Sequence, residues 1–171
     1  PRDLELKEEI CHHKLRERKN QQAWSCFKDL ALGDKSKWNN ILNYLSLSFE
    51  LKKQKELNNI YSLVLKRLPA GEELFVYQIY EQTFAKDSTD YKMHCKRITN
   101  LEWQSLEGQT LKQSCLINTK SKKAYSYGFE LYKKYPENIE FKKRFLQESL
   151  QRKDTSYAET ILKELNGEKE V

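Results

Sequence analysis

The sequence predicts an all-α protein built from about five antiparallel helix pairs, and three observations support this prediction. Leu, Lys, Glu and Gln, which favour helices, dominate a chain of 171 residues that contains only 5 Gly and 3 Pro. Apolar residues recur at steps of three and four through most of the chain, as they do on one face of a helix. Residues 57–69 also align with residues 124–136 at an offset of 67 residues, close to twice the period of about 34 residues of stacked helix–turn–helix repeats.

Residues 120–165 show the predicted layout most clearly. One apolar face covers residues 124–135 and ends at Pro136, because proline lacks the backbone N–H and disfavours helix in the residue before it. A second amphipathic segment begins near Asn138, and a third follows the polar residues around position 154. None of these segments can bury its apolar face alone, so each needs a neighbouring helix.

The first half of the chain supplies further amphipathic segments. Residues 2–16 form a polar, weakly periodic segment, and residues 21–31 carry a compact apolar face. The clearest pattern of this half covers residues 38–49, and residues 57–68 follow in the same register. Residues 74–85 are apolar on more than one face, as expected for a helix that is covered on two sides.

The second half continues this pattern with one weak segment. Residues 91–101 share an apolar face, whereas residues 107–117 include Gly108 and few apolar positions, which predicts a short helix or an irregular connection. The second helices of the pairs are expected to begin near residues 20, 54, 89, 120 and 154. We therefore expect one helical-repeat domain over residues 1–166 and a frayed polar end over residues 167–171.

Composition and motifs narrow the possible classes of function. The chain has 31 basic and 25 acidic residues, a net charge of +6, which indicates a mixed, solvated surface with a mild basic excess. No apolar run approaches the ~18 residues of a membrane span, so we expect no membrane association. The phosphate-binding loop and the common hydrolase motifs are missing, so we expect neither catalysis nor a cofactor. Because the sequence begins at Pro1 without Met, we expect it to be part of a longer protein.

Four cysteines occur singly along the chain: Cys11, Cys26, Cys95 and Cys115. In a helical, Lys-rich chain they are expected to be small buried residues in a reducing compartment. The alternative is a metal site, because all three histidines stand within two residues of a cysteine. Adjacent residues on a helix point about 100° apart and converge poorly on one ion, and zinc motifs use wider spacings. We therefore expect no metal.

Residues 120–144 form a basic and aromatic stretch with eight basic, three acidic and six aromatic residues. Its candidate binding residues are Lys122, Lys123, Tyr125, Tyr132, Lys133, Lys134, Lys142, Lys143 and Arg144. Three interpretations are open: a solvated surface whose lysines favour helix C-termini, a surface for an acidic protein segment, or a surface for RNA phosphates. Lysine outnumbers arginine, which favours loose attraction to negative charge over bidentate base reading. Trp103, at an expected helix end, is a further candidate anchor for a partner.

Residues 38–69 resemble half-a-TPR (HAT) repeats, in which a Trp and a Tyr mark the first helix and an acidic residue ends it. Trp38, Tyr44 and Glu50 match the first helix, and the run Leu-Lys-Arg-Leu-Pro at residues 65–69 matches the end of the second. Residues 124–165 are similar to the same pattern. Ordinary tetratricopeptide repeats share the period and the helix pair, so both families stay open.

This resemblance implies a right-handed α-solenoid that acts as a non-catalytic scaffold for protein–protein interaction. HAT-repeat proteins are mostly parts of RNA-processing assemblies, and several dimerise through their repeats. We therefore expect an intracellular, nuclear protein whose partner is an acidic segment, a helix or a second copy of the chain. A solenoid offers an extended groove for such a partner. The alternative is a helical domain that binds RNA directly through residues 120–144.

Overall fold

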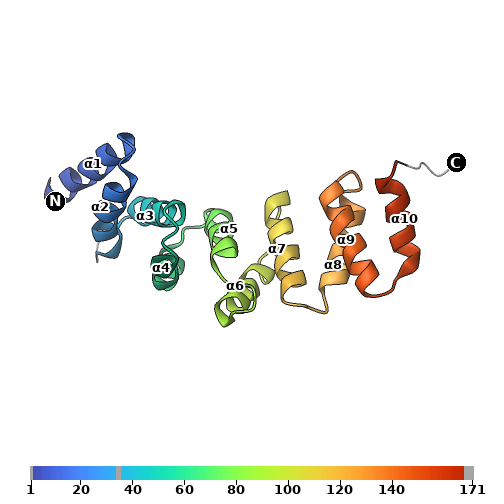
Figure 1. Cartoon of the computed structure of the whole chain (residues 1–171). Helices are drawn as coiled ribbons and strands as arrows, with labels where there is room; N and C mark the ends of the chain where they lie inside the picture. Colours follow the sequence, from blue (N-terminus) through green and yellow to red (C-terminus); the bar gives the residue numbers. More distant parts are fainter. Residues whose placement is uncertain (1, 34–35, 168–171) are drawn as a thin grey trace. The chain divides into compact units, whose positions relative to one another are not determined.

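The computed structural model describes residues 2–33 and 36–167, and over these residues the chain forms ten α-helices joined by turns (Figure 1). The prediction of an all-α protein is confirmed. The chain divides into two compact units, residues 1–85 (unit 1) and residues 86–171 (unit 2). None of the helices in the described part of the chain is long and apolar enough to cross a bilayer.

The helices alone do not test three expectations: the single domain, the right-handed solenoid and the frayed C-terminal end. The single domain expected over residues 1–166 and the right-handed solenoid stay predictions. Residues 168–171, most of the expected frayed end, lie outside the described residues.

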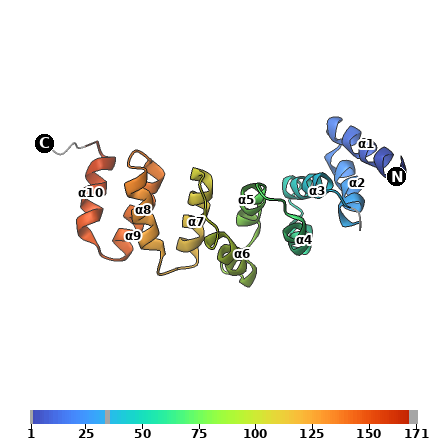
Figure 2. The same cartoon turned by 180° about the vertical axis from the view of Figure 1, so that it is seen from behind.

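Unit 1 holds five of the described helices, each packed on the next along the chain. They are α1 (Arg2–Arg16), α2 (Asn20–Leu32), α3 (Trp38–Glu50), α4 (Gln54–Arg67) and α5 (Glu73–Thr83). Apolar residues of α2, α3, α4 and α5 are buried, and Phe27, Tyr44 and Leu45 fully so, whereas α1 leaves Leu4, Leu6 and Ile10 exposed. Seen from behind, the same succession of helices is clear in Figure 2.

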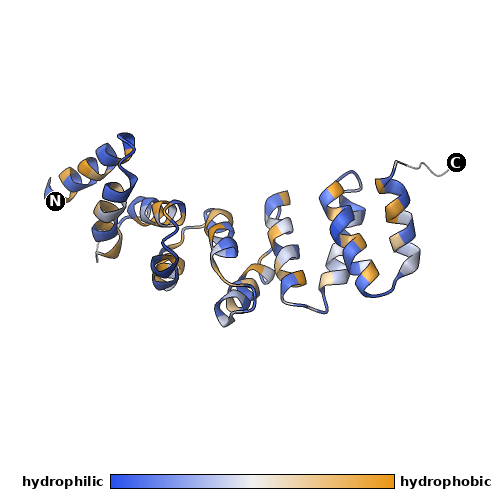
Figure 3. Cartoon of the chain, in the orientation of Figure 1, coloured by the Kyte–Doolittle hydropathy of each residue, from blue (hydrophilic) through white to orange (hydrophobic). Residues whose placement is uncertain are grey.

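Unit 2 repeats this plan with five further helices in the described region. They are α6 (Thr89–Thr99), α7 (Leu106–Asn118), α8 (Ala124–Lys134), α9 (Ile139–Gln151) and α10 (Thr155–Leu165). Apolar and polar residues alternate along these helices (Figure 3), and the buried positions include Leu131, Phe145 and Ile161. Helices begin at residues 20, 54, 89, 124 and 155, within a few residues of the starts predicted for the second helices of the pairs.

A recurrent turn joins the two helices of four pairs. Arg18, Lys52, Lys120 and Lys153 each have a positive φ, between 52° and 59°, and each follows a helix end by two residues. In the α3–α4 turn, the Lys52 N–H donates to the Phe49 carbonyl (3.1 Å) and the Lys53 N–H to the Ser48 carbonyl (2.8 Å). These two bonds are the Schellman motif. The other three turns have the same pair of bonds, and the four cations lie 34, 68 and 33 residues apart, as a period of about 34 residues requires.

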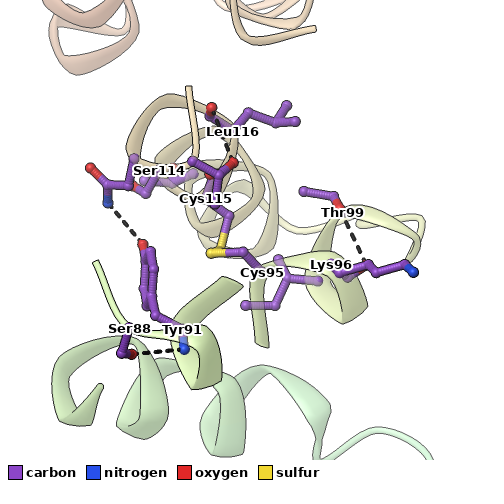
Figure 4. Close-up of a disulfide and its surroundings, with 12 residues drawn as sticks. Ser88, Tyr91, Cys95, Lys96, Thr99, Ser114, Cys115 and Leu116 are labelled. Atoms are coloured by element: carbon purple, nitrogen blue, oxygen red, sulfur yellow. Dashed lines mark hydrogen bonds between the residues drawn. A yellow bond between two sulfur atoms is a disulfide. The ribbon is translucent and has the colours of Figure 1, made fainter. Parts of the chain in front are cut away.

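The four cysteines form two disulfides, which corrects the expectation of four separate thiols. Cys11 bonds to Cys26 and joins α1 to α2, and Cys95 bonds to Cys115 and joins α6 to α7. Figure 4 shows the second bridge beside Tyr91, whose hydroxyl accepts a hydrogen bond from the Asn118 side chain (2.8 Å). In this state no cysteine sulfur is available as a thiolate ligand.

The segment that the sequence predicted most weakly is a full helix, α7, of 13 residues. Ser105 caps it, because its side-chain oxygen accepts from the Gly108 N–H (3.1 Å). The helix buries Gly108, Gln109 and Gln113, so its inward face carries little hydrophobic periodicity. Gly108 is required there: a Cβ at this position would lie 2.3 Å from Trp103 Cε3 and 2.9 Å from Trp103 Cβ.

We expect the substitution Gly108→Ala to destabilise unit 2 by about 1–3 kcal/mol, because the added methyl overlaps the Trp103 side chain close to its backbone. Helix propensity acts in the opposite direction by about 1 kcal/mol, so the steric cost must exceed it. Urea denaturation followed by circular dichroism measures the change. The matched control is Gly33→Ala, whose Cβ would meet only ordinary contacts at 3.6 and 3.9 Å; equal stability of the two variants would contradict the packing of Trp103 on α7.

Candidate binding site in unit 2

Two adjoining hollows form a groove in unit 2, which we call the unit 2 groove. Their volumes are about 520 and 270 Å³, and they share Lys112, Tyr127 and Glu130. Helix α7 contributes Gln109, Lys112 and Leu116, and α8 contributes Ser126, Tyr127, Glu130, Leu131 and Lys134. The rest of the lining comes from two other places. Ser121 and Lys123, the N-cap of α8, lie before that helix, and further residues between Thr99 and Gln104 lie at the end of α6 and just after it.

Lys112 and Tyr127 form the centre of the groove. The Lys112 ammonium donates to the Leu101 carbonyl (3.1 Å) and lies 5.4 Å from the centre of the Tyr127 ring. Burial raises the pKa of Tyr127 to about 12, with smaller contributions from the charge of Glu130 and from Tyr135. The phenol therefore stays neutral at physiological pH and offers a hydroxyl that can donate or accept a hydrogen bond.

One wall of the groove is held in place by Trp103 and Gln109. The Trp103 indole N–H donates to the Ile98 carbonyl (3.0 Å), and the Gln109 amide nitrogen donates to the Trp103 carbonyl (2.9 Å). The other amide atom, Gln109 Oε1, is buried and finds no hydrogen-bond donor among the described residues. This oxygen is shielded from solvent, so it is not offered to a ligand in the groove.

Four residues of the predicted binding surface are partly buried and make contacts between helices of unit 2. Tyr125 on α8 donates to Asp154 (2.5 Å), the residue before α10, and Tyr132 on α8 donates to Glu164 (2.7 Å) on α10. These two bonds connect α8 to α10. Lys142 forms an ion pair with Glu164 (2.8 Å) and keeps 14% of its side chain exposed. Arg144 donates to Ser114 Oγ (2.6 Å) on α7.

The other five residues of the predicted surface are exposed: Lys122, Lys123, Lys133, Lys134 and Lys143. Two of them line the hollows of the groove and three do not. Lys123 and Lys134 line the unit 2 groove, whereas the Lys133 ammonium lies 4.4 Å from the Phe129 ring centre. Lys143 lies near Glu140 at 3.8 Å. Two of the nine predicted residues therefore line the unit 2 groove, and the binding role of the stretch stays a prediction.

The cluster of Glu164, Lys142 and Tyr132 makes unit 2 sensitive to acid. Burial alone would raise the pKa of Glu164, but the hydrogen bonds from Lys142 and Tyr132 outweigh it and lower the pKa below 4.5. A carboxylate with a lowered pKa in the folded state adds stability above its unfolded pKa, and this stability is lost as the pH falls through the folded value.

We therefore expect unit 2 to lose roughly 1 kcal/mol from this carboxylate as the pH falls from neutral to below 4.5, a modest figure because Glu164 is partly exposed. Denaturation titrations at neutral and acid pH measure it. The variant Glu164→Gln keeps an acceptor for Tyr132 but has no proton to gain, so its acid loss should be smaller. The same acid loss in both proteins would show that other carboxylates carry the effect.

Sequence reasoning did not find Lys112, Tyr127, Glu130 and Gln109 as site residues. Gln109 and Lys112 lie on α7, whose helical pattern is weak, and Tyr127 was assigned to the apolar face of its helix. The spacing of Lys123, Tyr127, Glu130 and Lys134 at steps of three and four is the signal that could have found this face. Comparison of the chain with protein families, with curated proteins and with solved structures gave no match.

Proposed function

We propose that the chain is a non-catalytic helical-repeat scaffold of the HAT or tetratricopeptide type, arranged as a right-handed solenoid, that binds a protein partner. The repeated helix pairs and the recurrent turn near every 34th residue support this architecture. The observation that carries the binding function is the unit 2 groove, which is lined by three lysines and two aromatic side chains.

The chemistry of the groove favours an acidic segment. Carboxylates suit the ammonium groups of Lys123 and Lys134, which line the groove. Lys123 precedes α8 and Lys134 ends it, so the two cations stand roughly 16 Å apart along the helix axis. Two acidic positions in the partner at that separation, about five residues of an extended chain, meet both lysines. Glu102 and Glu130 also line the groove, so a uniformly acidic run fits less well than two separated carboxylates.

Selection of peptides from a random phage-displayed library tests this proposal, with the whole chain as bait. We expect the selected sequences to contain Asp or Glu at two separated positions with an aromatic or aliphatic residue between them. The acidic signature should disappear when the bait is the double variant Lys123→Glu, Lys134→Glu. Selection of basic or uncharged peptides, or the same peptides on both baits, would contradict binding in the groove.

The cellular compartment is a separate part of the proposal. The resemblance to HAT proteins supports a nuclear RNA-processing complex, whereas disulfides form and persist mainly in oxidising compartments. The two disulfides therefore favour a location outside the nucleus and cytosol as the second candidate. Alkylation of free thiols in intact cells, followed by mass spectrometry, decides between the two: four alkylated cysteines support the nuclear proposal, and two intact bridges support the oxidising compartment.

A further inference from the structure

The turns that join the helices of unit 2 carry a second cationic surface next to the groove, which Ser121 and Lys123 of the first turn also line. Lys120 lies in the α7–α8 turn and Lys153 in the α9–α10 turn, and both occupy the same left-handed position of a Schellman motif, with φ values of 52° and 59°. This position holds each side chain beyond the helix end. Lys122 follows in the first turn, and Arg152 precedes Lys153 in the second.

The two turns lie next to each other at one edge of unit 2. The Arg152 guanidinium donates to the Lys122 carbonyl (3.3 Å) and stacks 4.8 Å from the centre of the Tyr125 ring. Figure 1 shows both turns at the lower edge of unit 2, opposite the α8–α9 turn. We call Lys120, Lys122, Arg152 and Lys153 the basic turn edge.

The charges of this edge are available to a ligand. All four residues are exposed, and within the described residues no carboxylate lies within ion-pair distance of their cationic groups. Asp154, the neighbouring carboxylate, accepts from Tyr125 (2.5 Å) and Ser156 (3.0 Å). Its charge is therefore directed at these two hydroxyls.

We propose that the basic turn edge binds the phosphate backbone of a nucleic acid without sequence preference. Phosphates are bound mainly by Lys, Arg, Ser and Thr side chains, and the two turns consist of such residues together with Gln151 and Asp154. A protein interface needs an apolar core and is depleted in lysine, whereas the exposed large apolar side chains that flank the second turn in sequence are Leu150 and Tyr157, one on each side. This surface goes beyond the proposed scaffold function, because the groove variant Lys123→Glu, Lys134→Glu leaves all four of its residues in place.

The test is fluorescence anisotropy with a labelled oligouridine RNA, titrated with the whole chain at several salt concentrations. The variant is Lys120→Gly, Lys153→Gly, because glycine accepts a positive φ without strain and the turns are kept. We expect the wild-type affinity to fall log-linearly with salt, and the variant to bind several-fold more weakly with a salt slope smaller by roughly 1.4, about 0.7 per lost phosphate contact.

The matched control removes the same charge from exposed positions on α6 and α10, in the variant Lys96→Gln, Lys163→Gln. It should keep the wild-type salt slope. The proposal is overturned if the wild-type chain does not bind the RNA, or if both variants lose affinity equally, since net charge alone then explains binding. It is also overturned if polyglutamate binds the edge as tightly as the RNA, which would assign the surface to an acidic protein.

Discussion

Replacing Phe145 by alanine is expected to destabilise unit 2 by about 3–5 kcal/mol, the largest loss that we predict for a single side chain. Phe145 is fully buried on α9, and its ring centre lies 5.2–5.8 Å from those of Tyr125, Phe129, Tyr132 and Tyr157. These partners come from α8 and α10, so the phenylalanine joins three helices. Its removal leaves a cavity and ends four ring contacts at once.

Urea denaturation followed by circular dichroism measures this loss. The variant Phe145→Leu should cost less, because it keeps part of the buried volume. The substitution Phe75→Ala is the matched control, because this ring on α5 is 42% exposed, and surface changes usually stay within about 0.5 kcal/mol. A loss below 1 kcal/mol for Phe145→Ala would contradict the aromatic core of unit 2.

Removing the Cys95–Cys115 disulfide is expected to cost about 3 kcal/mol, because the bridge closes a chain segment with a sequence separation of 20 residues and restricts the unfolded chain. The variant Cys95→Ala, Cys115→Ala tests this by the same denaturation measurement.

Both cysteines of this bridge are at most 1% exposed, as is Cys11, whereas Cys26 is partly exposed. A thiol reductant should therefore open the Cys11–Cys26 bridge first.

The control for this prediction is the variant in a reductant. In a reductant the wild-type chain loses both bridges, so its stability should fall to that of the reduced double variant. The double variant has only the Cys11–Cys26 bridge to lose, so its own stability should fall by what that bridge contributes. Four free thiols in protein prepared without reductant, or a wild-type stability that a reductant leaves unchanged, would contradict the two bridges.

The sequence was sufficient to predict the helical architecture, because hydrophobic periodicity and turn residues report directly on local structure. Helices begin at residues 20, 54 and 89, the starts predicted for the second helices of the first three pairs. Ser88 illustrates why: its side chain accepts from the Tyr91 N–H (3.1 Å) and fixes the start of α6. The start near residue 120 was early by four residues, because Lys120 continues the polar run but lies in a Schellman turn.

Features that depend on tertiary contacts could not be predicted in the same way. Helix α7 was weak in sequence because Gly108, Gln109 and Gln113 face inward, and the reason for the glycine is the Trp103 ring. The disulfides were missed because 15 and 20 residues separate the partners, and only the packing of helices brings them together. The candidate site was predicted in part: Lys123 and Lys134 line the groove, whereas the interhelical partners of Tyr125 and Arg144 are not visible in sequence.

The most direct test of the proposed function is a binding titration with an acidic peptide selected on the wild-type chain, carried out at low salt. Three proteins are compared: the wild type, the groove variant Lys123→Glu, Lys134→Glu, and a control variant Lys133→Glu, Lys143→Glu with the same charge change on exposed residues outside the groove. Exposed charges contribute little to stability, so all three should unfold alike. We predict that the groove variant binds about tenfold more weakly or worse and that the control stays within about threefold of the wild type. Wild-type affinity in the groove variant, or an equal loss in both variants, would contradict the groove as the binding site.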